Sequence, residues 1–258
     1  MSDAALLGVQ VRATNKAFWR NPASAFFTFA FPLMFLVIFT TLLGGGRVEV
    51  SPGVLLDETD YYVAAMAAFS VITATFTNLA IAITFTRDAG ILKRTRGTPL
   101  PPRIYLSGRV LHAILVSVLL VAITSAFGVA LYEAEFPTGS LLFEYVVTVI
   151  VGGMAFSGLG LATTAIVPNA EAAPAVVNAL ILPLLFLSGI FIPLGTDAPE
   201  WIKVVGNIFP VKHFGEAMLG SFYGPPFPFE WSDVLVVAAW GVVGLAVAIR
   251  FFSWEPRR

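Results

Sequence analysis

The stretch TRDAGILKRTRGTPLPPR, residues 86–103, is a long basic run between two apolar blocks of the chain. A short helix is expected from Asp88, a favoured N-cap residue, to Arg96, with Gly97 ending it. Three prolines beyond residue 98 exclude regular helix until the next apolar block begins. The pattern therefore predicts a basic helix held at a membrane surface, where a soluble partner can dock. The plainer alternative is a charged loop that only sets topology.

The composition around this stretch is that of an integral membrane protein. Of the 258 residues, 57% are apolar and 12% are charged, and the mean hydropathy is +0.85. Soluble proteins carry about 25% charged residues. Cysteine is absent, which excludes disulfides, thiol nucleophiles and cysteine-based metal sites. No short apolar stretch with a small-residue cleavage site precedes the first apolar block, so no removable signal peptide is expected.

Six apolar segments are predicted to cross the hydrocarbon core, which is about 30 Å thick. They are residues 25–43, 61–85, 104–131, 145–167, 172–192 and 234–252. The expected fold is an all-α polytopic membrane protein in which residues 1–258 form one transmembrane domain. Its other parts are an amphipathic interfacial helix at 3–20, a mostly acidic loop at 47–60, the basic segment at 87–103, and an external re-entrant segment of two short helices within 193–232.

Charge distribution predicts the orientation of this domain. Six spans place both termini on one side, together with twelve of the 15 basic residues; Arg47, Lys203 and Lys212 are the other three. Only four of the 16 acidic residues lie on the terminal side. The positive-inside rule makes that side cytoplasmic, and with it the basic stretch at 86–103.

The basic stretch resembles the segment between the second and third spans of ABC-2 type permeases. That segment has an acid, a glycine, an apolar pair, two basic residues and an Ala/Gly-Thr-Pro-Leu ending. The matching residues are Asp88, Gly90, Ile91, Leu92, Lys93, Arg94, Gly97, Thr98, Pro99 and Leu100. Two positions depart from the pattern: Thr86 replaces a frequent second acid, and Thr95 replaces a frequent leucine. The run SGIFIP at 188–193, followed by Trp201, Pro210 and Glu216, is similar to the drug- and lipid-export branch of these permeases.

The resemblance implies a transport subunit rather than an enzyme. It implies two copies of the permease in a prokaryotic inner membrane, with spans one and five at their contact, and two copies of a separate ATPase that binds ATP and Mg. No nucleic acid is expected as a partner. The residues implied to couple the chain to the ATPase are Asp88, Gly90, Ile91, Leu92, Lys93 and Arg94, with Asp88 as helix cap, Ile91 and Leu92 as apolar contacts and Arg94 as partner of an acid.

The residues themselves contain no energy source for transport. A P-loop requires a lysine that follows a glycine, and none of the four lysines does. No Asp, Glu or Lys falls well inside a predicted span, as ion-coupled carriers usually require. We expect no catalytic residues, no metal site and no cofactor in this chain, and a structural, hydrogen-bonded role for His112. The alternative is an ion-coupled secondary carrier or a membrane-embedded enzyme that works without an ATPase.

A cargo pathway is predicted from aromatic and polar stripes. Phe27, Phe31, Phe35 and Phe39 recur every four residues of the first span and so form one face. Polar and small groups recur on spans two and five; the residues assigned to the pathway are Phe31, Phe35, Phe39, Ser70, Thr73, Thr77, Asn178 and Leu185. A cavity of this kind between two copies suits an amphipathic, drug-like or lipid-like cargo. The alternative is that the Phe stripe faces lipid and the hydroxyl stripe holds helices together.

Overall fold

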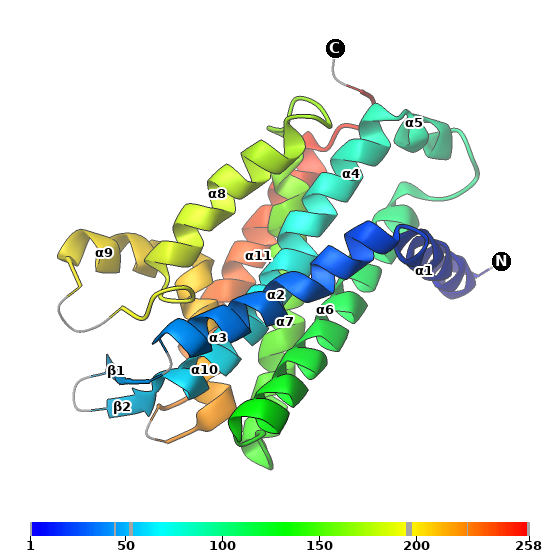
Figure 1. Ribbon diagram of the computed structural model, residues 1–258. Helices are drawn as coiled ribbons and strands as arrows, with labels where there is room; N and C mark the ends of the chain where they lie inside the picture. Colours follow the sequence, from blue (N-terminus) through cyan, green and yellow to red (C-terminus); the bar gives the residue numbers. More distant parts are fainter. Residues whose placement is uncertain (1, 44, 52–53, 195–197, 226, 257–258) are drawn as a thin grey trace.

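The chain folds into a helical bundle with a short β-hairpin at one end (Figure 1). The computed structural model describes residues 2–256 except 44, 52–53, 195–197 and 226. In chain order the elements are α1 (Asp3–Trp19), α2 (Pro22–Leu43), β1 (Arg47–Ser51), β2 (Val54–Asp57), α3 (Glu58–Ile72), the π-helical turn η1 (Thr73–Thr77), α4 (Asn78–Asp88), α5 (Ile91–Arg96), α6 (Pro102–Tyr132), α7 (Ser140–Thr163), α8 (Ala173–Leu187), α9 (Glu200–Ile208), α10 (Pro210–Tyr223) and α11 (Trp231–Phe251).

Five helices of the described residues are long and apolar enough to cross a membrane: α2, the continuous unit α3–η1–α4, α6, α7 and α11. This confirms the predicted all-α membrane fold. The fifth predicted span corresponds to α8, which is apolar but has only 15 residues. At about 1.5 Å of rise per residue it is shorter than the hydrocarbon core. The six-span arrangement therefore stays a prediction.

The helix α3–η1–α4 is the core of the bundle. Every residue of α3 from Tyr61 to Ile72 is buried, against α2, α6, α7 and α10. The helix widens into a π turn at Thr73–Thr77, a feature that occurs frequently at functional sites. The Ser70 hydroxyl lies 3.3 Å from that of Thr124 on α6, so a polar contact also joins the two helices.

Glycines in α7 allow the close helix contacts expected from the sequence. A Cβ atom at Gly160 would lie 2.8 Å from the carbonyl oxygen of Phe76, and one at Gly158 would lie 3.0 Å from that of Gly241 on α11. Neither distance leaves room for a side chain. The α7–α11 pair is accordingly the most extensive helix contact in the bundle.

Two sequence predictions about connecting segments are wrong. Residues 47–51 and 54–57, expected to be loop, form the antiparallel strands β1 and β2; the Val-Glu-Val alternation at 48–50 is a strand signal that the acidic residues obscured. The fifth span, expected to reach residue 192, ends as a helix at Leu187. Gly189 takes a left-handed φ of +87°, and its carbonyl oxygen accepts a hydrogen bond from the Tyr61 hydroxyl at 2.6 Å.

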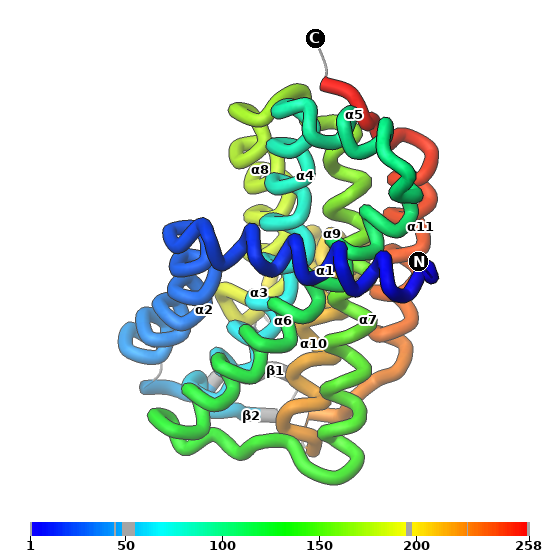
Figure 2. Tube along the Cα trace, turned by 90° about the vertical axis from the view of Figure 1, so that its right-hand side faces the viewer, coloured from blue at the N-terminus to red at the C-terminus, as the bar shows by residue number. Residues whose placement is uncertain are grey.

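The remaining predicted segments are helical, but their interfacial, cytoplasmic and external positions stay predictions. Helix α1 lies across the bundle and packs on α6 (Figure 2). Residues 200–223 form α9 and α10, and Pro210 begins α10 at the position where a proline is tolerated. Helix α5 and the C-terminus lie at one end of the bundle, and the β-hairpin lies at the other (Figures 1 and 2).

Candidate functional site

Helices α4 and α5 meet at a tight elbow formed by Ala89 and Gly90. Gly90 has a φ of +69°, a left-handed conformation that glycine adopts without strain. Helix α4 continues through Asp88, and Gly90 is the residue that precedes α5. The prediction that Asp88 caps the basic helix is therefore wrong, because Asp88 is the last residue of the preceding helix. Gly90 allows the turn between α4 and α5, because glycine adopts its left-handed conformation without strain.

Arg87, at the end of α4, is buried with only 1% of its surface exposed. Its Nη1 donates to the carbonyl oxygen of Thr164 at 2.9 Å. Its Nη2 donates to the carbonyl oxygens of Val167 at 2.8 Å and Pro168 at 3.3 Å. These carbonyls end α7 and begin the turn to α8. A planar guanidinium suits such a set of acceptors, because its five donors are fixed in one plane.

Asp88, the next residue of α4, makes a second contact with the same turn. Its Oδ2 accepts a hydrogen bond from the backbone N–H of Ala170 at 2.5 Å, and its Oδ1 lies 3.4 Å from Nε of Arg87. We call these two residues and their contacts with residues 164–170 the elbow clamp. The clamp fixes the elbow before α5 to the turn between α7 and α8, so the two segments are held as one unit.

The two apolar residues of α5 have different surroundings. Leu92 is fully buried in a cluster with Leu79, Ile83 and Tyr105, so it anchors α5 to the bundle. Ile91 is 41% exposed. The prediction that both supply contacts to a partner is therefore wrong for Leu92. The exposed surface of α5 consists of Ile91 and its basic neighbours, Lys93, Arg94 and Arg96.

The Phe stripe on α2 divides into two halves. Phe27 and Phe31 are 55% and 41% exposed. Phe35 and Phe39 pack against Phe191, with ring centroids 5.6 Å and 5.8 Å apart. Successive rings along the stripe remain in contact, at 5.7 to 6.0 Å. The prediction that these rings share one face is confirmed. The first half of the stripe is exposed, whereas Phe35 and Phe39 are only partly exposed.

The pathway residues predicted on the second and fifth spans are less exposed than the first half of the Phe stripe. Ser70 is fully buried, bonded to the carbonyl of its own helix, and Leu185 is 1% exposed. Their assignment to a cavity between two copies is wrong for this conformation, because neither reaches the surface of the chain. Thr73, Thr77 and Asn178 are partly exposed, and η1 contacts α8. These three remain candidates for the pathway.

Comparison with known proteins decides which family this architecture represents. The family model described as ABC-2 type transporter matches residues 6–223, from α1 to the end of α10. The chain belongs to the ABC-2 type transporter family. It is also similar to the protein named "Putative transport permease YvfS" of Bacillus subtilis (strain 168), with 25% identity over 242 residues that cover 91% of this chain and 92% of that protein. The chain is therefore a membrane transport permease, and its family implies that it works with an ATPase subunit.

The permease also carries a polar cluster on α10 and α11 that sequence reasoning missed. Ligand-type atoms of His213, Glu216 and Asp233 lie within 4.8 Å of one another. Nδ1 of His213 lies 2.7 Å from Asp233, and Nε2 lies 3.0 Å from the carbonyl oxygen of Asn207. Burial raises the pKa of Glu216, whose carboxylate has Lys212 at 3.6 Å. Each group already has a protein partner, so the expected absence of a metal site stays a prediction. Asp233 lies 20 residues beyond His213, which hid the cluster.

Two further residues of the permease have roles that the sequence did not indicate. Arg87 was grouped with the basic residues of the connecting stretch, although it is buried in the elbow clamp. The position of Arg87 in the last turn of an apolar helix was the available signal for a structural role. The same position is also typical of a basic residue that sets membrane topology. The expectation of a hydrogen-bonded His112 is wrong for its Nε2, which is buried and has no hydrogen-bond partner among the described residues.

Proposed function

We propose that this permease is the membrane subunit of an ATP-driven exporter. In this proposal two copies of the chain assemble with two copies of a separate ATPase in a prokaryotic inner membrane, with both termini cytoplasmic. The ATPase binds ATP and Mg and docks on α5. The cargo is a hydrophobic or amphipathic molecule, drug-like or lipid-like, taken from the cytoplasm or the inner leaflet.

The observation that carries this proposal is the way in which α5 is attached to the bundle. Ile91 and three basic side chains face outward, while Leu92 and the elbow clamp hold the helix on the bundle. An apolar residue ringed by positive charge suits an acidic groove on a soluble partner. Because the clamp joins the elbow to the α7–α8 turn, a push on α5 is transmitted directly to two further helices.

The absence of a recognisable energy source in the sequence favours the same proposal over a carrier that works without an ATPase. The sequence has no lysine that follows a glycine, and therefore no P-loop for ATP. The buried cation of the core, Arg87, is bonded to backbone carbonyls and a carboxylate, as a structural residue would be. An ion-coupled carrier would instead need a titratable group facing a water-filled cavity.

The aromatic surface of α2 supports the choice of cargo. Phe26, Phe27 and Phe31 are each more than 40% exposed on a helix with little buried surface. Such a surface can bind an apolar molecule or a second copy of the chain. We assign it to the cargo pathway and the contact between two copies, together with Thr73, Thr77 and Asn178. Helix α2 contains no charged residue, which disfavours a densely anionic cargo.

The test is reconstitution with an ATPase whose gene neighbours this one. The permease alone should not hydrolyse ATP, whereas the purified complex should hydrolyse it and export a hydrophobic dye from vesicles. Ile91→Asp should abolish copurification of the ATPase and export. The matched control is Leu55→Asp, which places the same charge on an exposed leucine in the β-hairpin at the other end. Hydrolysis by the permease alone, or full export with Ile91→Asp, would refute the proposal.

A further inference from the structure

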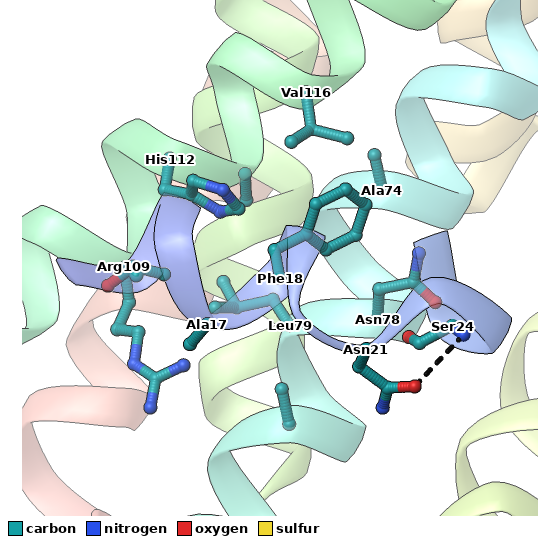
Figure 3. Close-up of a pocket in the computed structure, with 13 residues that line it drawn as sticks. Ala17, Phe18, Asn21, Ser24, Ala74, Asn78, Leu79, Arg109, His112 and Val116 are labelled. Atoms are coloured by element: carbon teal, nitrogen blue, oxygen red, sulfur yellow. Dashed lines mark hydrogen bonds between the residues drawn. The ribbon is translucent and has the colours of Figure 1, made fainter. Parts of the chain in front are cut away.

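A cavity of about 210 Å³ lies between α1, the start of α2, the η1–α4 region and α6 (Figure 3). Its apolar walls include Phe18, Leu79 and Val116. Asn21, Ser24 and Asn78 lie at one side of it and Arg109 and His112 at the other, as Figure 3 shows. At about 30 Å³ per water molecule this volume is that of several waters, or of a small polar headgroup.

The polar groups of this cavity can donate hydrogen bonds to an anion. His112 is 7% exposed, and its Nε2 has no hydrogen-bond partner among the described residues. With its proton on Nε2, the neutral imidazole can donate a hydrogen bond to an anionic oxygen. A buried nitrogen without a hydrogen bond lowers the stability of the fold. A ligand in the cavity that forms a hydrogen bond with Nε2 would therefore stabilise the fold.

Arg109 adds a positive charge that the protein does not neutralise. Nε and Nη2 of its guanidinium donate to the Tyr105 hydroxyl at 3.2 Å and 2.9 Å. Among the described residues no carboxylate lies within 4.0 Å of Arg109, and the cavity lining contains no acid. The charge at this cavity is therefore complementary to an anion.

A groove of about 600 Å³ continues from the cavity along the outside of α1 and α6. Its lining is mostly apolar and also includes Arg12 and Asn15 of α1. The cavity and the groove share His112 and Val116 in their lining. The groove is lined on α6 by Leu111, Leu115 and Leu119, which are 38%, 52% and 44% exposed. The same site thus offers a cationic chamber and, next to it, an open strip of aliphatic surface.

We propose that this site binds an anionic phospholipid. The phosphate of the headgroup lies in the cavity against Arg109 and His112, and an acyl chain lies in the groove between α1 and α6. A free phosphate would satisfy the cavity but leave the groove bare, whereas a zwitterionic lipid would bring its own cation next to Arg109. Bound lipid holds α1 on the bundle, and this role is independent of the ATPase and of the cargo.

The close contact between α1 and α6 supports a lipid site formed by both helices. A Cβ atom on Gly108 would lie 2.4 Å from Cγ of Gln10, so the two helices touch beside the cavity. Toward the end of α1, Trp19 is 51% exposed and donates its indole N–H to Asn15. An exposed tryptophan on a helix of this kind is typical of the headgroup level of a membrane.

The experiment measures lipid binding to the purified, delipidated permease by native mass spectrometry and thermal unfolding. The probes are phosphatidylglycerol, phosphatidylcholine and inorganic phosphate. Phosphatidylglycerol should bind one molecule per chain and raise the unfolding temperature, and phosphatidylcholine should bind at least about tenfold more weakly. Arg109→Gln should reduce phosphatidylglycerol affinity by about tenfold or more. The matched control, Arg250→Gln, removes an exposed arginine in the last turn of α11 and should retain binding.

A second variant separates lipid binding from folding. His112→Phe removes the unpartnered nitrogen, so the lipid-free variant should be at least as stable as the wild type. It should nevertheless lose most of the stabilisation by phosphatidylglycerol. Equal affinity for the two lipids, unchanged affinity in both site variants, or stabilisation by inorganic phosphate equal to that by phosphatidylglycerol would each overturn the proposal.

Discussion

Replacing Arg87 by methionine tests whether the elbow clamp holds the coupling region together. Methionine fills a similar volume but donates no hydrogen bond. The carbonyl groups of Thr164 and Val167, on residues 2% and 0% exposed, would lose a charged donor, and Asp88 would lose its cation. We expect the α7–α8 turn to separate from the elbow while the rest of the bundle keeps its packing.

The magnitude follows from the burial of the guanidinium. Removing one partner of a buried ionic pair typically costs about 3–5 kcal/mol, because the remaining partner is left unpaired. For a chain of this size each kcal/mol corresponds to about 2–4 °C of unfolding temperature, so a decrease on the order of 10 °C is expected. The double variant Arg87→Met with Asp88→Asn should be less destabilised than the sum of the two single variants, because it leaves no unpaired charge.

The assay combines thermal unfolding in detergent with hydrogen exchange of the backbone amides. Exchange should increase in residues 164–172 and at the elbow, and stay unchanged in the middle of α6. Arg96→Met is the control, since Arg96 is exposed on α5 and its loss should change the stability by less than about 0.5 kcal/mol. If Arg87→Met is as stable as Arg96→Met, or if exchange at 164–172 does not rise, the clamp does not hold these segments together.

Four further results are expected. Reporter fusions at residue 97 should be cytoplasmic and at residue 137 external, and the opposite result at either position would exclude the predicted orientation. Leu92→Asp should prevent stable folding, because Leu92 is fully buried, whereas Ile91→Asp should fold and lose only the ATPase; equal expression and stability of the two would contradict this division of α5. Phe31→Ala should change which compounds are exported while ATP hydrolysis persists, and an unchanged export profile would assign that surface to lipid. Since burial raises the pKa of Glu216, the folded state retains this proton more tightly than the unfolded chain, and stability is lost as the pH rises above the ordinary value of 4.5; Glu216→Gln should reduce that loss, and an unchanged pH slope of the unfolding temperature would speak against it.

The sequence by itself determined the membrane class, most helix positions and the family. Apolar runs of about 20 residues can only be satisfied in lipid as helices, so their approximate positions can be read from the sequence, although only five of the six expected segments form helices of spanning length among the described residues. The Phe stripe was likewise predictable, because side chains four residues apart lie on one face of any helix. The basic stretch at 86–103 was recognisable as a unit because its charge, glycines and prolines are local properties of the chain.

Only the tertiary structure decided which of those residues are available for function. Ile91 and Leu92 are adjacent and chemically alike, yet one is exposed and the other buried, because α5 turns at Gly90 onto the cluster around Ile83. Arg87 belongs to a basic run but is bonded to carbonyls about 80 residues away. The cavity at His112 is likewise formed by α1, α4 and α6 together. Such contacts depend on how distant helices pack, and local periodicity carries no information about packing partners.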